Sequence, residues 1–284
     1  METRNNSARH AAPAVAASAP PVSAETNNAI ESGDLLNFIQ PTEFVDLPTQ
    51  GRFYPIGHPL HAKTSVEIKM MTAKEEDILT NRSLIKKGVA LNKMIQSLLV
   101  DKSINAKDLF IGDKNAIIIN ARISAYGPEY KTTVTCPACG EKQPYHFNLE
   151  EFENDYEHAN TLPEGIQQNE RGNFVMQLPK TGLSVEVRLL NGHDEITPTK
   201  GKIENLTLLT SLKKFVVSVN NVTDKNQVGK FLEVMPARDS RFLREKYAAL
   251  VPNVDMTQDF ECNSCGHSED LEVPLSAEFF WPRS

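Results

Sequence analysis

Two stretches of sequence decide the fold, and they share one pattern: VTCPACGEK at residues 134–142 and FECNSCGHS at residues 260–268. Each stretch holds two cysteines separated by two residues and followed by a glycine. A glycine there lets the chain turn tightly, so that backbone amides can point at the sulfur atoms. This pattern is typical of a zinc knuckle. The chain's four cysteines all lie in these stretches, at Cys136, Cys139, Cys262 and Cys265.

The number of cysteines strengthens this interpretation. A single C-x-x-C pair would be weak, because chance and thioredoxin-like redox pairs both produce it. Two pairs with no cysteine left over predict one structural Zn²⁺ held by four thiolates. Two disulfides, or four unrelated core cysteines, stay open as alternatives, although paired C-x-x-C motifs fit a reducing compartment better than a disulfide framework.

The separation between the pairs, from residue 139 to residue 262, is the unusual feature. Common zinc ribbons place roughly 15–20 residues there. Alternating apolar and polar residues flank both pairs, which predicts a β-hairpin with a knuckle at each tip. The metal would then join two distant parts of the chain into one ribbon.

The remaining sequence predicts helices and small antiparallel sheets. A T-x-x-E capping box at Thr72 and Glu75 predicts the start of a helix with Ile78, Leu79 and Ile85 on its buried face. The other expected elements are a strand over 64–71, helices over 91–99 and 117–126, a linker over 150–172, a hairpin over 174–190 and a mainly helical stretch to about 246 with a break near Pro236. We therefore expect an α+β fold, with helices packed on small antiparallel sheets and a four-cysteine zinc ribbon.

Three parts are expected along the chain. Residues 1–32 are rich in alanine and proline and should form a disordered tail, because the apolar stretch lacks leucine and is broken by prolines, unlike a signal peptide. Residues 33–150 should form an N-terminal α+β half that ends in the first knuckle hairpin. Residues 151–284 should form a second α+β half that ends in the second hairpin and an aromatic C-terminus.

Composition and motifs narrow the function. The net charge of −7 argues against a broad phosphate-binding surface, and no apolar run approaches the roughly 18 residues of a membrane span. No phosphate-binding glycine loop, nucleophile elbow or paired histidine motif is present, so we expect no enzyme, no catalytic residue and no small-molecule substrate. The alternative is a zinc-ribbon protein that binds nucleic acid or has a regulatory role. However, the residues around the second knuckle are negatively charged and would repel phosphate: Glu261, Glu269, Asp270 and Glu272.

The C-terminus carries three aromatic residues, Phe279, Phe280 and Trp281. Aromatic side chains are favoured anchors at interfaces, so these residues are candidates for partner binding. Packing against the chain's own core beside the zinc hairpin is the alternative.

Several segments resemble the baseplate protein family of T4-type contractile-tailed bacteriophages, specifically its hub subunit or hub assembly protein. These segments span residues 44–282 and are LPTQGRFYP, TAKEEDIL, ARISAYGPEY before CPACG, MPARDSRFLREKY before CNSCG, and EFFWP. The resemblance implies a non-enzymatic part of the tail baseplate, or a factor that assembles its hub, with other hub and tail proteins as partners. It places the protein in the host cytoplasm during assembly and leaves open whether the protein stays in the virion. The alanine- and proline-rich tail is not part of the resemblance.

Overall fold

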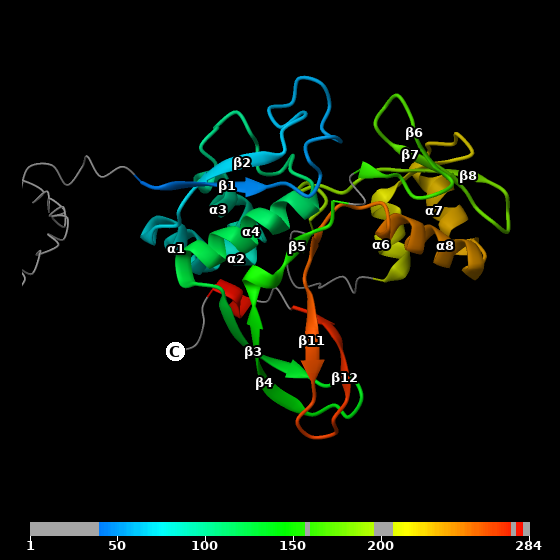
Figure 1. The fold of residues 1–284 in the computed structure, drawn as a ribbon. Helices are drawn as coiled ribbons and strands as arrows, with labels where there is room; N and C mark the ends of the chain where they lie inside the picture. The colour runs from blue at the N-terminus through cyan, green and yellow to red at the C-terminus, as the bar shows by residue number, and fades with distance from the viewer. Residues whose placement is uncertain (1–39, 157–159, 196–206, 274–276, 281–284) are drawn as a thin grey trace, which may run out of the picture. The chain divides into compact units, whose positions relative to one another are not determined.

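The structure is a computed structural model that describes residues 40–156, 160–195, 207–273 and 277–280 (Figure 1). Helices and small antiparallel sheets alternate along these residues, which confirms the α+β expectation. The predicted tail, residues 1–32, lies outside the described residues. Contacts group Gln40–Ser284 as one compact unit.

The first elements along the chain include one long helix, which is the last of them. They are β1 (Thr42–Asp46), β2 (Ser65–Lys69), α1 (Ala73–Thr80), α2 (Arg82–Lys86), α3 (Ala90–Leu98) and α4 (Ile111–Tyr126). Strands β1 and β2 pair antiparallel. As predicted, Glu75 accepts hydrogen bonds from the backbone N–H and the hydroxyl of Thr72 at the start of α1.

The helix expected to continue to Ile85 is in fact two helices. Asn81 adopts an extended conformation after α1, and its side chain accepts the backbone N–H groups of Ser83 and Leu84 at the start of α2. The new helix turns Ile85 toward solvent, so the expected burial of Ile85 was wrong.

The second group of elements surrounds a four-stranded antiparallel sheet. Its strands are β6 (Ile166–Gln168), β7 (Phe174–Gln177), β8 (Ser184–Val187) and β9 (Val216–Val219), in that order across the sheet. Helices α6 (Leu208–Phe215), α7 (Lys225–Val234) and α8 (Ala237–Ala248) complete the group. The hairpin expected over 174–190 and the break near Pro236 are confirmed.

Two expectations in this region were wrong. The supposed linker over 150–172 contains β6 and β5 (Glu153–Asn154), and β5 pairs with β10 (Val254–Asp255). The supposedly helical stretch contains β9, which pairs with β8. Strands of two to four residues are too short to show an alternating pattern, and their partners are distant in sequence.

The buried apolar residues form two clusters. One cluster collects residues 45–149 together with residues 254–280, so the C-terminal hairpin packs with the N-terminal helices. The other collects residues 166–250 around the four-stranded sheet, and Phe110 packs against both. The expected boundary at residue 150 stays a prediction.

The loop over residues 47–55 is attached to the start of α4 by a buried carboxylate. Asp113 accepts hydrogen bonds from the backbone N–H of Thr49 at 3.1 Å and from the hydroxyls of Thr49 and Tyr54, each at 2.7 Å. Burial raises the pKa of Asp113 to about 6, although the hydrogen bonds from Tyr54 and Thr49 act to lower it. None of the helices among the described residues is both long enough and apolar enough to cross a membrane.

Candidate metal centre

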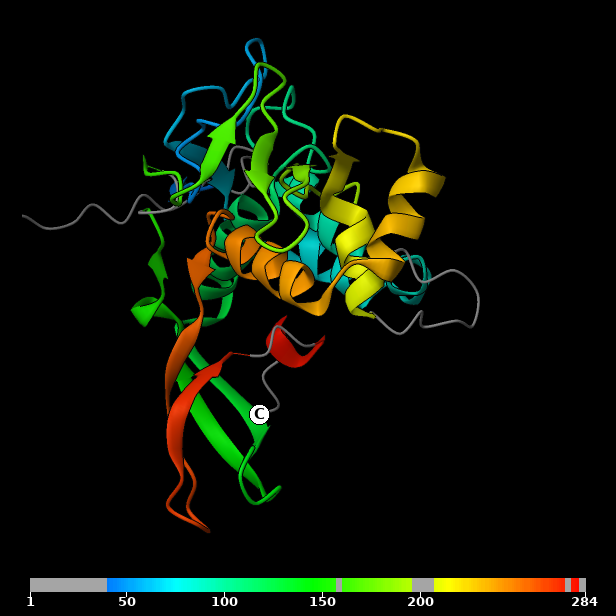
Figure 2. The same cartoon turned by 90° about the vertical axis from the view of Figure 1, so that its right-hand side faces the viewer.

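Two hairpins carry the four cysteines. Strand β3 (Glu129–Thr135) pairs with β4 (Lys142–Asn148), and β11 (Thr257–Glu261) pairs with β12 (Ser268–Glu272). The hairpins lie side by side in both views, with their cysteine-bearing turns at the same end (Figures 1 and 2). Both hairpins were predicted from the alternating residues around the C-x-x-C motifs.

The two turns have the same backbone geometry. In the first, the N–H of Cys136 donates to the carbonyl oxygen of Glu141 at 2.8 Å, and the N–H of Gly140 donates to Cys136 at 2.9 Å. In the second, Cys262 donates to His267 at 2.8 Å, and Gly266 donates to Cys262 at 2.9 Å. The φ angles of Gly140 and Gly266 are 75° and 68°, a left-handed conformation that disfavours other residues. The glycine in each motif is therefore required by its turn.

The structure brings all four predicted ligands together. Their sulfur atoms lie within 4.8 Å of one another. Across the hairpins, Cys136 Sγ lies 3.8 Å from Cys265 Sγ, and Cys139 Sγ lies 3.7 Å from Cys262 Sγ. Each pair joins one buried and one exposed cysteine.

These distances fit a tetrahedral metal site. A zinc–sulfur bond of about 2.3 Å places the corners of the tetrahedron about 3.8 Å apart. A disulfide would instead bring two sulfur atoms to about 2.05 Å, and all four cysteines are free thiols here. The donor set is thus compatible with a soft divalent metal such as zinc.

The electrostatics of the cluster also suit a cation. The backbone N–H groups of Cys265 and Ser264 lower the pKa of the Cys262 thiol to about 7. At Cys139 the backbone N–H of Glu141 acts to lower the pKa, but the Cys265 thiol, burial and the remaining thiols outweigh it and raise the pKa to about 12. Four thiols this close oppose one another's ionisation, whereas a bound metal removes that opposition.

Two glutamines bridge the hairpins, and the sequence analysis missed both. Gln143 Nε2 donates to the carbonyl oxygen of Glu261 at 2.9 Å, while its Oε1 accepts the N–H of Asn263 at 2.9 Å. Gln258 makes a similar pair of hydrogen bonds in the opposite direction. Its Oε1 accepts the N–H of Asn148 at 3.1 Å, and its Nε2 donates to the carbonyl oxygen of Asn148 at 2.5 Å. These amide bonds, together with the hydrogen bond from the Tyr145 hydroxyl to the Asp259 carbonyl oxygen at 2.7 Å, link the two hairpins. The available signal was a glutamine at a core-facing position of an alternating strand.

Aromatic rings connect the two hairpins to each other and to the C-terminal turn. The ring centroid of Phe279 lies 5.2 Å from that of Tyr130, and that of Tyr145 lies 5.3 Å from that of Phe260. Phe279 and Phe280 are only 1% and 4% exposed, so they occupy the chain's own core. Trp281 lies outside the described residues. Partner binding by this aromatic end stays a prediction.

The comparison with known proteins decides the family. A family model described as T4 bacteriophage base plate protein matches residues 42–281. The chain belongs to this family. The match confirms the resemblance to the baseplate family and covers both cysteine motifs of this baseplate protein. No match was found among curated proteins or among solved structures.

Proposed function

We propose that this baseplate protein is a non-enzymatic structural or assembly component of the baseplate hub, with one zinc ion held by Cys136, Cys139, Cys262 and Cys265. The family match over residues 42–281 carries the proposal. The sulfur cluster supports its zinc component, because its spacing suits tetrahedral coordination. Other phage tail proteins would be the partners.

The zinc would have a structural role, because it would link the turns of the two hairpins. Four thiolates fill a tetrahedral site and leave no open position for a substrate or an activated water. The chain's own residues hold the hairpins in register through Gln143 and Gln258, and the metal would neutralise the thiolates between the two turns. The proposed zinc site therefore has no catalytic role.

The surface of the second hairpin favours a protein partner over nucleic acid. Glu261, Glu269, Asp270 and Glu272 are not buried in this hairpin, and all are acidic. Such a surface repels phosphate groups. Fluorescence anisotropy with labelled DNA and RNA at low salt measures whether the chain binds nucleic acid. Micromolar affinity that weakens steeply with salt would favour the nucleic-acid alternative.

Metal analysis of the purified chain tests the zinc. We expect about one zinc per chain and four thiols that become reactive after chelation. A chain without zinc that shows two disulfides by mass spectrometry would refute this part of the proposal.

The hub assignment needs a separate experiment. Affinity purification of the tagged chain from infected cells, with purified virions probed in parallel, identifies its partners and its final location. We expect hub and tail proteins to co-purify. Co-purification with capsid or replication proteins alone would argue against a role in the baseplate. Cytoplasmic assembly is supported if the complex forms before virions are complete.

A further inference from the structure

The edge of β2 that faces away from β1 is only partly covered. In the β1–β2 register, Val45 pairs with Val66, and Leu47 N–H bonds to the Thr64 carbonyl, so the backbone groups of Ser65 and Glu67 point outward. The Val100 N–H bonds to the Glu67 carbonyl at 3.2 Å. Beyond that point the chain leaves the edge. Within the described part of the chain, no hydrogen bond reaches the backbone N–H or C=O of Ser65 or the N–H of Glu67.

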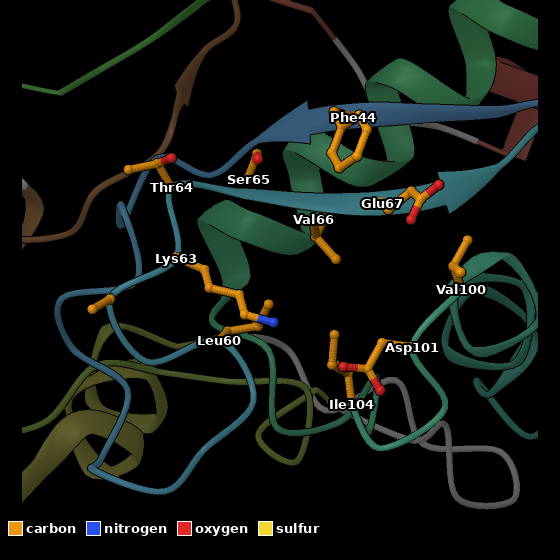
Figure 3. Close-up of a pocket in the computed structure, with 11 residues that line it drawn as sticks. Phe44, Leu60, Lys63, Thr64, Ser65, Val66, Glu67, Val100, Asp101 and Ile104 are labelled. Carbon is orange, nitrogen blue, oxygen red and sulfur yellow. The ribbon is translucent and has the colours of Figure 1, made fainter.

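A groove of about 460 Å³ lies along this uncovered edge (Figure 3). Its apolar lining includes Leu60, Val66 and Ile104. Phe44 also lines it and is 71% exposed, which is unusual for a large aromatic side chain. Apolar lining beside free backbone groups is what a β-strand needs, because its amides bond to the edge while alternate side chains enter the groove.

The charges along the groove are ordered. Lys63 lies toward the Thr64 end, whereas Glu67 and Asp101 lie toward Val100 (Figure 3). A strand that is antiparallel to β2 would have its N-terminal side near Glu67 and Asp101 and its C-terminal side near Lys63. A basic residue followed by apolar residues and then an acidic residue matches this order.

We propose that this groove binds an extended segment of a partner protein, which adds to β2 as an antiparallel strand. The short segment at Leu99 already pairs antiparallel with Ile68, so the added strand would continue the same line. Its apolar side chains would contact the exposed ring of Phe44 and lie over Leu60, Val66 and Ile104, which are 0%, 4% and 1% exposed. That the strand comes from another tail protein rests on the proposed function, whereas the binding edge itself does not.

A synthetic peptide tests the edge. The probe is fluorescent acetyl-Lys-Thr-Val-Thr-Val-Thr-Glu-amide, titrated with the full chain and followed by anisotropy. Alternate amides of a bound strand face β2. Two further peptides are therefore compared, one N-methylated at its valines and the other at its threonines. One of them should bind roughly tenfold more weakly than the unmodified peptide, whereas the affinity of the other should change little. A peptide with its lysine and glutamate exchanged should also bind more weakly.

Variants of the chain test the same contact from the side of the protein. Ser65→Pro removes the outward N–H at the first position of an edge strand, where proline is tolerated, and should weaken binding roughly tenfold. Ser65→Thr keeps the N–H and is the control. If Ser65→Pro lowers the melting temperature, the pair Lys63→Glu with Glu67→Lys replaces it and should prefer the peptide with exchanged charges.

Three results would overturn the proposal: no peptide binding, binding that neither N-methylated version weakens, or a dimer in light scattering that Ser65→Pro converts to a monomer. The last result would assign the edge to a second copy of this chain. None of these results depends on the virion experiment, so failure here is distinguishable from failure of the baseplate proposal.

Discussion

Arg122 Nε donates a hydrogen bond to the carbonyl oxygen of Phe279 at 2.7 Å, joining α4 to the short helical turn η3 (Ala277–Phe280). The same guanidinium donates to the carbonyl oxygens of Gly127 at 2.7 Å and Glu129 at 3.1 Å. Its side chain is fully buried. One arginine therefore holds the end of α4, the start of the first hairpin and the C-terminal turn together.

Replacing this arginine should destabilise the chain strongly. Arg122→Met keeps much of the volume but leaves three carbonyl groups without their donor, at a cost of about 3 kcal/mol or more in the free energy of unfolding. Urea denaturation measures it. Arg241→Met is the control, because Arg241 is exposed and, among the described residues, forms an ion pair with Glu245 in its own helix. Equal effects of both variants would contradict the role assigned to Arg122.

Deletion of residues 278–284 tests the aromatic end. Because Phe279 and Phe280 are buried, their loss should lower the melting temperature, and a single buried phenylalanine is worth about 3–5 kcal/mol. Deletion of residues 282–284 alone keeps all three aromatic residues and is the control. Unchanged melting combined with lost co-purification of a tail protein would instead support partner binding by Phe279, Phe280 and Trp281.

Cys262→Ser should release the metal and loosen the hairpins locally. Hydrogen exchange should become faster in β11 and β12, whereas α3 and α4 should keep their protection because they belong to a large apolar core. Ser264→Ala, in the same turn but outside the four thiols, should keep the zinc. Loss of protection throughout the chain would show that the zinc site and the helical core unfold as one unit.

Gln143→Met should weaken the junction between the hairpins. The variant preserves volume but leaves the Glu261 carbonyl and the Asn263 N–H without partners, which costs about 1–3 kcal/mol. It should also speed the transfer of zinc to a chelator, since Asn263 lies in the second cysteine turn. Gln227→Met, at an exposed helix position, serves for comparison. Unaltered unfolding and metal transfer would mean that the bridge contributes little.

Asp113 predicts a pH dependence of stability. Its pKa in the folded chain, about 6, exceeds the ordinary value of 3.8, so the fold favours the protonated carboxyl. This stabilisation is complete below about pH 4 and is lost as the pH rises through 6, a change of roughly 3 kcal/mol.

Asp113→Asn should remove this dependence. The difference in unfolding free energy between the two chains, measured from pH 4 to pH 7, isolates the contribution of Asp113, because any acid release of zinc affects both. A difference that does not vary with pH would contradict the assignment.

Much of the candidate site could be predicted from local sequence. Each C-x-x-C-G turn is set by a few neighbouring residues, since the glycine conformation and the turn's own hydrogen bonds need nothing distant. The capping box at Thr72 and the apolar repeat of α4 are equally local, because helical periodicity and cap hydrogen bonds act within a few residues. The four cysteines that the fold brings together belong to the same local patterns.

The meeting of the two C-x-x-C pairs was predicted from the sequence, but only the tertiary structure decided which cysteines face each other and which other distant residues meet. The cysteine pairs across the hairpins, the bridge from Gln143 to Asn263 and the bond from Arg122 to Phe279 all join residues more than 100 positions apart. The short strands β5, β6 and β9 likewise depend on their partners for hydrogen bonds. Pattern and propensity describe how a segment exposes its own faces, whereas a buried amide or guanidinium is stable only where the folded chain supplies its acceptors.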